Sequence, residues 1–148
     1  MVDCGQLGWS TMRKLLKVVL CFILLLLLWG TATSAKKPTL LCPERNDLIR
    51  FVSAGPKMVY KVDYVMHRES RCRQLAFNPD DPNGGSYGLF QINGYWCKPS
   101  RYSRLGWLQE QGILKQCSDL YNPLVNAKAF MLMYDYAGWE PWGGDPWN

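Results

Sequence analysis

The chain has 148 residues, of which 48% are hydrophobic and 20% charged, and its formal net charge is +5. This length allows one globular domain but not two. The positive charge is too weak and too scattered along the chain to predict nucleic-acid binding.

The first 35 residues are predicted to be a targeting segment outside the domain. Basic residues between positions 13 and 17 precede an unbroken apolar run, Val18–Trp29, and small residues follow up to Ala35. Even when extended to residue 32, this run is shorter than the ~20 apolar residues that span a bilayer. A signal peptide cleaved after Ala35 is therefore favoured over a membrane anchor formed by residues 15–32.

Residues 36–41 are then expected to form a linker, and residues 42–148 the domain. Without residues 1–35 the chain keeps 14 basic and 11 acidic side chains, a net charge of +3. This excess suits an anionic polymer such as a bacterial cell wall, although solubility explains it equally well. An exported protein that is secreted, periplasmic or virion-associated is expected, in monomeric form and with membrane contact only through an uncleaved N-terminal segment.

Four cysteines remain after cleavage: Cys42, Cys72, Cys97 and Cys117. An even number behind an export signal predicts two disulfides, with three possible pairings. The chain has a single histidine and no closely spaced cysteine pair, so a zinc site is not predicted.

Two short helices are predicted at the start of the domain. The first begins at residues 43–47 and has Leu48, Phe51 and Val52 on its apolar face. After a break at residues 53–56, a second helix starts near Met58, with apolar residues at helical spacing. Glu69 falls in the last turn of this second helix.

A hairpin and further helices complete the prediction. A strand at residues 75–77 leads through a run of turn residues into a partner strand over 87–92. An irregular segment precedes a helix over 108–119, and the final helix opens at Asn122 or Asn126 and is stopped by Gly138. The predicted fold class is α+β, mostly helical, with one small antiparallel hairpin inserted after the second helix.

Glu69 is the first candidate for chemistry. At a helix C-terminus the helix dipole disfavours further negative charge, which favours the protonated carboxyl that leaving-group protonation needs. The alternative is a surface glutamate that pairs with Arg68, Arg71 or Arg73. Position alone favours this alternative, because most glutamates are solvated.

The motifs around Glu69 change that balance. Glu69-Ser70 is followed by Ala-Phe-Asn-Pro at 76–79, Gly-Gly-Ser-Tyr-Gly-Leu-Phe-Gln-Ile-Asn at 84–93 and Tyr-Trp-Cys at 95–97. Together these motifs resemble the lysozyme superfamily, both its animal-type members and the bacterial and phage lytic transglycosylases. The resemblance covers roughly residues 42–142 and implies a lysozyme-like fold, a peptidoglycan glycan strand as substrate, and no metal or organic cofactor.

The resemblance also assigns roles residue by residue. Glu69 matches the catalytic acid, and the disulfides it implies are Cys97–Cys117 and, with it, Cys42–Cys72. The residues expected to bind substrate or to lie beside the acid are Ser86, Tyr87, Gln91, Asn93, Tyr95, Trp96 and Trp139. Gln91 and Asn93 have the alternative of satisfying backbone groups at the hairpin.

Ser86 is the departure from the animal-type pattern, which carries an aspartate at this position. A hydroxyl cannot act as that nucleophile, and Asp80 and Asp81 are the nearest spare carboxylates, expected to cap the turn. One acid fits a lytic transglycosylase that cleaves the β-1,4 bond between N-acetylmuramic acid and N-acetylglucosamine. A goose-type-like lysozyme that uses water and a catalytically silent wall-binding or structural protein are the alternatives.

Overall fold

The computed structural model describes residues 14, 17–20, 23 and 39–147. The chain divides into two units between Pro38 and Thr39, and the unit that starts at Thr39 is the folded domain. The predicted boundaries at residues 35 and 41 stay predictions, and most of the apolar run 18–29 lies outside the described residues. Within the described ranges, no helix is both long enough and apolar enough to cross a membrane.

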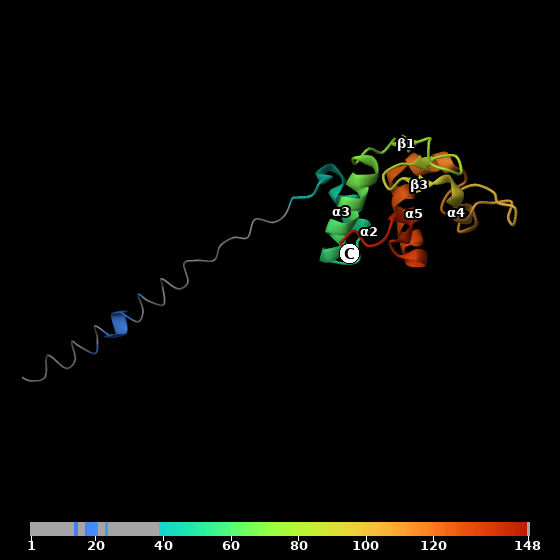
Figure 1. The fold of residues 1–148 in the computed structure, drawn as a ribbon. Helices are drawn as coiled ribbons and strands as arrows, with labels where there is room; N and C mark the ends of the chain where they lie inside the picture. The colour runs from blue at the N-terminus through green and yellow to red at the C-terminus, as the bar shows by residue number, and fades with distance from the viewer. Residues whose placement is uncertain (1–13, 15–16, 21–22, 24–38, 148) are drawn as a thin grey trace, which may run out of the picture. The chain divides into compact units, whose positions relative to one another are not determined.

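The domain is mostly helical with a small sheet, as the sequence predicts. A 3-10 turn, η1 (Pro43–Arg45), leads into α2 (Asn46–Val52), which is followed by the two long helices α3 (Pro56–Ser70) and α5 (Pro123–Ala137). Helix α2 contacts both α3 and α5 (Figure 1). Their apolar faces form the core, whose largest fully buried side chains include Ile49, Met66, Phe90, Phe130 and Met133.

Local signals place the long helices, although α3 begins at Pro56, within the predicted break, and not near Met58. Pro56 starts α3 and Asn122 caps α5, because the Asn122 side chain accepts hydrogen bonds from the N–H groups of Leu124 and Val125. Glu69 lies in the last turn of α3, as predicted. The apolar face of α2 differs from the prediction, since Ile49 is buried whereas Phe51 is 52% exposed.

The sheet has three strands of two residues each, β1 (Phe77–Asn78), β2 (Ser86–Tyr87) and β3 (Ile92–Asn93), paired antiparallel in that order. The predicted single strand over 87–92 is therefore wrong. Residues 88–91 form a turn in which Gly88 and Gln91 have positive φ angles of 73° and 46°. A Cβ at Gly88 would collide with Asn126 Nδ2 and the Leu120 carbonyl, so only glycine fits this turn.

The predicted helix over 108–119 is also wrong. Helix α4 covers only Trp107–Glu110, and a separate 3-10 turn, η3, covers Cys117–Tyr121. Gly112 adopts a φ of 70° between them, which ends the first helix. The Asp119 carboxylate then accepts hydrogen bonds from the N–H groups of Lys115 and Gln116, at 2.8 and 3.2 Å, and starts the second turn.

This capping makes stability depend on the charge of Asp119. Hydrogen bonds from the backbone N–H groups of Lys115 and Gln116 lower the pKa of Asp119. A carboxyl with a lowered folded-state pKa contributes stability above its unfolded pKa, and this is lost as the pH falls through the folded value. We expect Asp119→Ala to lower the unfolding free energy by about 1 kcal/mol at pH 7, and the difference from wild type to narrow below pH ~4. Urea titrations across this range measure it, and an equal difference at every pH would contradict the assignment.

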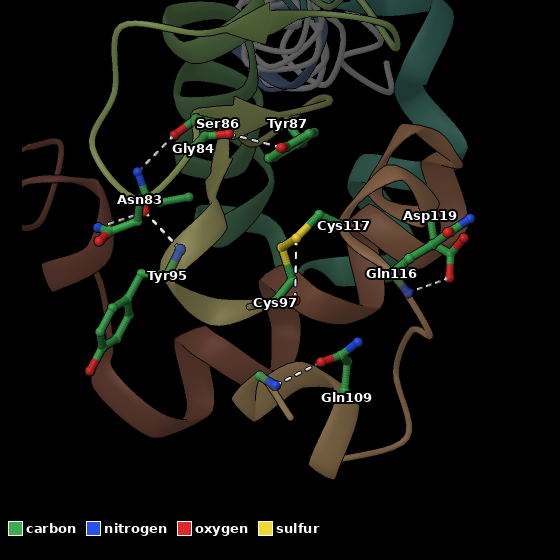
Figure 2. Close-up of a disulfide and its surroundings, with 12 residues drawn as sticks. Asn83, Gly84, Ser86, Tyr87, Tyr95, Cys97, Gln109, Gln116, Cys117 and Asp119 are labelled. Carbon is green, nitrogen blue, oxygen red and sulfur yellow. Dashed lines mark hydrogen bonds between the residues drawn. A yellow bond between two sulfur atoms is a disulfide. The ribbon is translucent and has the colours of Figure 1, made fainter. Parts of the chain in front are cut away.

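Two disulfides tie the domain together. Cys42–Cys72 joins the start of the domain to the end of α3, and Cys97–Cys117 joins the segment after β3 to η3 (Figure 2). These are the two pairs that the resemblance implies. The buried Asp63 carboxylate strengthens the first connection, because it accepts hydrogen bonds from the backbone N–H groups of Leu41 and Cys42 at 2.7 and 2.8 Å.

Candidate active site

A cleft of about 270 Å³ brings together the end of α3, the sheet with its preceding turn, α5, and the 3-10 turns η2 (Gly94–Trp96) and η4 (Glu140–Trp142). Its lining residues are Glu69, Asp81, Pro82, Ser86, Gln91, Ile92, Asn93, Trp96, Met133, Pro141 and Trp142. Five of the residues singled out from the sequence therefore meet in one cleft, although they come from α3, the sheet, the turn before β3 and η2. Tyr87, Tyr95 and Trp139 are not among its lining residues.

The Glu69 carboxyl is half-buried and held from one side. Arg68 donates from Nε and Nη2 to Oε1 of Glu69, at 2.9 and 2.6 Å, and Nη2 also donates to the Trp142 carbonyl at 2.5 Å. The pairing expected for a surface glutamate is thus formed, yet the carboxyl also lines the cleft. Within the described part of the chain, Oε2 of Glu69 makes no hydrogen bond, so this oxygen is left for a ligand.

Ser86, Asp80 and Asp81 differ in their exposure and in whether they line the cleft. Ser86 is 1% exposed, and its hydroxyl accepts a hydrogen bond from Asn93 Nδ2 at 3.3 Å. Asp80 is exposed in the turn, where its N–H donates to Asn78 Oδ1. Asp81, in contrast, lines the cleft together with Glu69, so it offers the cleft a second carboxyl group.

The amides of Gln91 and Asn93 hold the hairpin in shape. Gln91 Nε2 donates to the carbonyls of Ala76 and Gly88, at 3.2 and 3.0 Å. Asn93 Nδ2 donates to the Pro82 carbonyl at 2.9 Å, while its Oδ1 accepts from the Tyr95 N–H at 2.9 Å. Both side chains thus satisfy backbone groups, the alternative role predicted for them, while they also line the cleft.

An aromatic hollow of about 210 Å³ adjoins the cleft and shares Trp96 with it. The Trp96 ring meets those of Tyr95, Trp107 and Tyr136 edge-on, with ring centroids 5.4, 5.3 and 6.3 Å apart. Tyr95 is 62% exposed and lines this hollow rather than the cleft. Exposed aromatic faces of this kind suit stacking on the apolar faces of sugar rings.

Tyr87 points away from the cleft. Its ring packs between Phe77 and Tyr121, with centroids 5.0 and 5.7 Å away, and its hydroxyl donates to the Gly84 carbonyl at 2.8 Å (Figure 2). Alternation along the short strand explains this, because its neighbour Ser86 takes the cleft side.

The tryptophan on the cleft wall beside Glu69 is Trp142. Its Nε1 donates to the Phe90 carbonyl at 2.9 Å. Trp139, which the resemblance places beside the acid, is 8% exposed and packs against Phe130 and Tyr134. The sequence carries no signal that separates these two tryptophans, nor one that places Met133 of α5 in the cleft.

Metal ligands do not gather at this site. In the ranges that the structure describes, no group of three or more His, Cys, Asp or Glu side chains is arranged to hold a metal ion. The protein groups that the cleft offers for chemistry are two carboxyls, a serine hydroxyl and the side-chain amides.

The mostly helical domain with its small sheet, and the cleft with one glutamate at a helix end, define the lysozyme-like class of α+β domain. The family model described as a lysozyme-like domain matches residues 55–144, well over half of the chain. The chain belongs to this family. Membership indicates a glycosidase or transglycosylase that degrades peptidoglycan. A comparison with curated proteins gives no match.

Proposed function

We propose that this protein is an exported lytic transglycosylase that cleaves the β-1,4 bond between N-acetylmuramic acid and N-acetylglucosamine in peptidoglycan, with Glu69 as its single catalytic acid. The observation that carries the proposal is the composition of the cleft. Glu69 lines it, and the position where a nucleophilic carboxylate is expected holds the buried hydroxyl of Ser86 instead.

The proposed reaction uses one carboxyl group twice. Glu69 first gives its proton to the oxygen that bridges the two sugars, and the bond from this oxygen to C1 of N-acetylmuramic acid breaks. The 6-hydroxyl of the same N-acetylmuramic acid then attacks C1 and returns its proton to Glu69, which closes a 1,6-anhydro ring. No water is consumed, and Glu69 ends in the protonation state in which it began.

Each remaining site residue has a proposed part in holding the strand. Ser86, Gln91 and Asn93 shape the wall formed by the sheet, while Tyr95 and Trp96 offer aromatic surfaces to sugar rings beyond the cleft. For Tyr87 and Trp139, whose side chains pack elsewhere, we propose a supporting role only. Trp142 supplies the apolar wall beside the acid.

Hydrolysis by water is the second candidate, and Asp81 favours it. A second carboxylate in the same cleft is what an inverting glycosidase uses to activate water. The two reactions cleave the same bond but leave different ends, an anhydro ring or a reducing sugar.

The Asp81→Asn variant separates the candidates by rate. In a transglycosylase Asp81 only lines the cleft, and we expect Asp81→Asn to keep the rate on purified peptidoglycan close to that of wild type. In a hydrolase the same change removes the general base, a loss on the order of 10² or more. Initial rates of soluble fragment release measure this, with Asp80→Asn as the matched control, because Asp80 lies in the same turn outside the cleft.

We also propose that residues 1–35 are an export signal or anchor, followed by a linker up to residue 41. The two disulfides fit an oxidising compartment outside the cytoplasm. Sequencing of the N-terminus of the exported protein tests this, with Lys36 expected as the first residue. A protein that keeps Val18–Trp29 would show a retained anchor instead.

A further inference from the structure

The basic loop, residues 98–104, carries the excess positive charge of the domain. Residues 39–147 contain twelve basic and eleven acidic side chains, and three of the basic ones, with no acidic one, lie in this loop: Lys98, Arg101 and Arg104. The rest of the domain therefore has a net charge of −2, from nine basic and eleven acidic side chains. In the described residues, the ion pairs are Lys61–Asp145 and Arg68–Glu69, so the loop cations form no ion pair with a carboxylate of the domain.

The basic loop lies beside the cleft and the aromatic hollow. Lys98, Ser100 and Ser103 line the aromatic hollow, which shares Trp96 with the cleft. Ser100 braces the loop, because its N–H donates to the Ser103 carbonyl at 2.9 Å while its hydroxyl accepts from the N–H groups of Tyr102 and Ser103 at 3.2 Å. One carboxylate, that of Glu110, also lines the hollow, where it accepts a hydrogen bond from the Ser103 hydroxyl. The loop thus offers a shaped and mainly positive surface beside the cleft.

Lys98 connects the basic loop to the turn between β1 and β2, at Gly84. A Cβ at Gly84 would collide with Lys98 Nζ, so the missing side chain at position 84 leaves the space that the ammonium group occupies. Lys98 also lines a neighbouring hollow with Asn83, Tyr95, Pro99 and Ser100. One cation therefore stands at the junction of the aromatic surface and the hairpin turn.

We propose that the basic loop binds the carboxylates of the stem peptides on the glycan strand that the cleft holds, so that the enzyme prefers peptide-bearing strands to bare glycan. This inference rests on the proposed peptidoglycan substrate. Removal of the peptide by an amidase leaves one lactyl carboxylate on each N-acetylmuramic acid, directly beside the sugar ring, whereas an intact stem peptide carries its carboxylates further from the sugar, along the peptide. Because the hollow and the cleft share Trp96, a strand lying in the cleft brings its own peptides to the loop.

The test compares uncross-linked strands that carry peptides with the same strands after an amidase has removed the peptides. We expect wild type to show a kcat/KM about tenfold higher on the peptide-bearing strands, through a lower KM, because two partly exposed charge contacts give about this factor. In Lys98→Gln/Arg104→Gln the ratio of kcat/KM on peptide-bearing strands to kcat/KM on peptide-free strands should fall close to one. The ratio for wild type should also fall as salt is raised, since exposed charges are screened.

A double variant with the same charge change, Lys57→Gln/Lys128→Gln, is the control and should keep the wild-type ratio, because neither lysine lines the cleft or the hollow. A wild-type ratio near one, or a ratio that survives in the loop variant, would overturn the proposal. If Lys98→Gln/Arg104→Gln changed cleavage only of whole walls that carry phosphate polymers, and not of isolated strands, the loop would bind phosphate groups. That result would overturn the proposal as well.

A binding measurement separates this proposal from the proposed function. Calorimetry with Glu69→Gln and the two kinds of strand reports the preference without cleavage. If wild type cleaves neither strand, the proposed function fails, while tighter binding of peptide-bearing strands still supports the loop. Equal binding of both strands counts against the loop even when cleavage is normal.

Discussion

Glu69→Gln should lower the rate of peptidoglycan cleavage on the order of 10³-fold while leaving the fold intact. A glutamine keeps the size of the side chain and still accepts a hydrogen bond from Arg68 through its amide oxygen, but it cannot give a proton to the bridging oxygen. General acid catalysis contributes ~10²–10⁴ to rates of this kind. A loss on the order of 10³ lies within this range and is expected because a single carboxyl acts in both proposed steps.

The measurement is the clearing of purified cell walls at equal protein concentrations. Glu44→Gln is the matched control, since Glu44 is exposed in η1 and does not line the cleft. Near-ultraviolet circular dichroism and urea midpoints of both variants should match wild type. If Glu69→Gln clears walls as fast as wild type, the Glu69 carboxyl is not the catalytic acid. If neither protein clears walls, a silent wall-binding protein becomes the better description.

Asn126→Leu should destabilise the domain by about 3–5 kcal/mol. Asn126 is fully buried and bonds three backbone groups, accepting from the Phe90 N–H at 2.9 Å and donating to the carbonyls of Tyr87 and Leu120 at 3.0 and 2.9 Å. Leucine has a similar volume but leaves all three groups without a partner. Each buried group without a hydrogen bond costs ~1–3 kcal/mol, which partial relaxation reduces.

Urea unfolding at neutral pH measures this loss, and Asn46→Ala is the control. The Asn46 side chain bonds Arg50 Nε in an exposed position, so the change should alter stability by less than about 1 kcal/mol. A loss below about 1 kcal/mol in Asn126→Leu would mean that the three backbone groups find other partners. Cleavage by the folded fraction should fall too, because the turn that Asn126 holds positions Gln91 in the cleft.

Asn126 also shows why the sequence predicts the hairpin only in outline. The mainly apolar run at 87–92, directly after a dense set of turn residues, favours one strand, and short-range patterns are all that a strand prediction uses. The turn at 88–91 is instead fixed by a side chain 36 residues beyond Phe90 in the sequence. The long helices are predictable because their signals are local: the Asn122 cap and the apolar spacing lie in or beside the helices themselves.

The candidate site also has a part that the local sequence predicts and a part that depends on the folded structure. The motifs around Glu69 and the hairpin predict which segments form the cleft, because they are contiguous in the sequence. Which side chains face it depends on how each turn is rotated. Asp81 rather than Asp80, and Trp142 rather than Trp139, line the cleft. No spacing rule separates the members of either pair.

The chemical identity of the newly formed sugar ends tests the central claim most directly. Purified glycan strands would be digested to completion by the wild-type protein, and the masses of the released fragments determined. A single-acid transglycosylase should release fragments that end in 1,6-anhydro-N-acetylmuramic acid, lighter by one water than their reducing counterparts, and Glu69→Gln should release none of them. Fragments that end only in reducing N-acetylmuramic acid would show hydrolysis and contradict the single-acid transglycosylase.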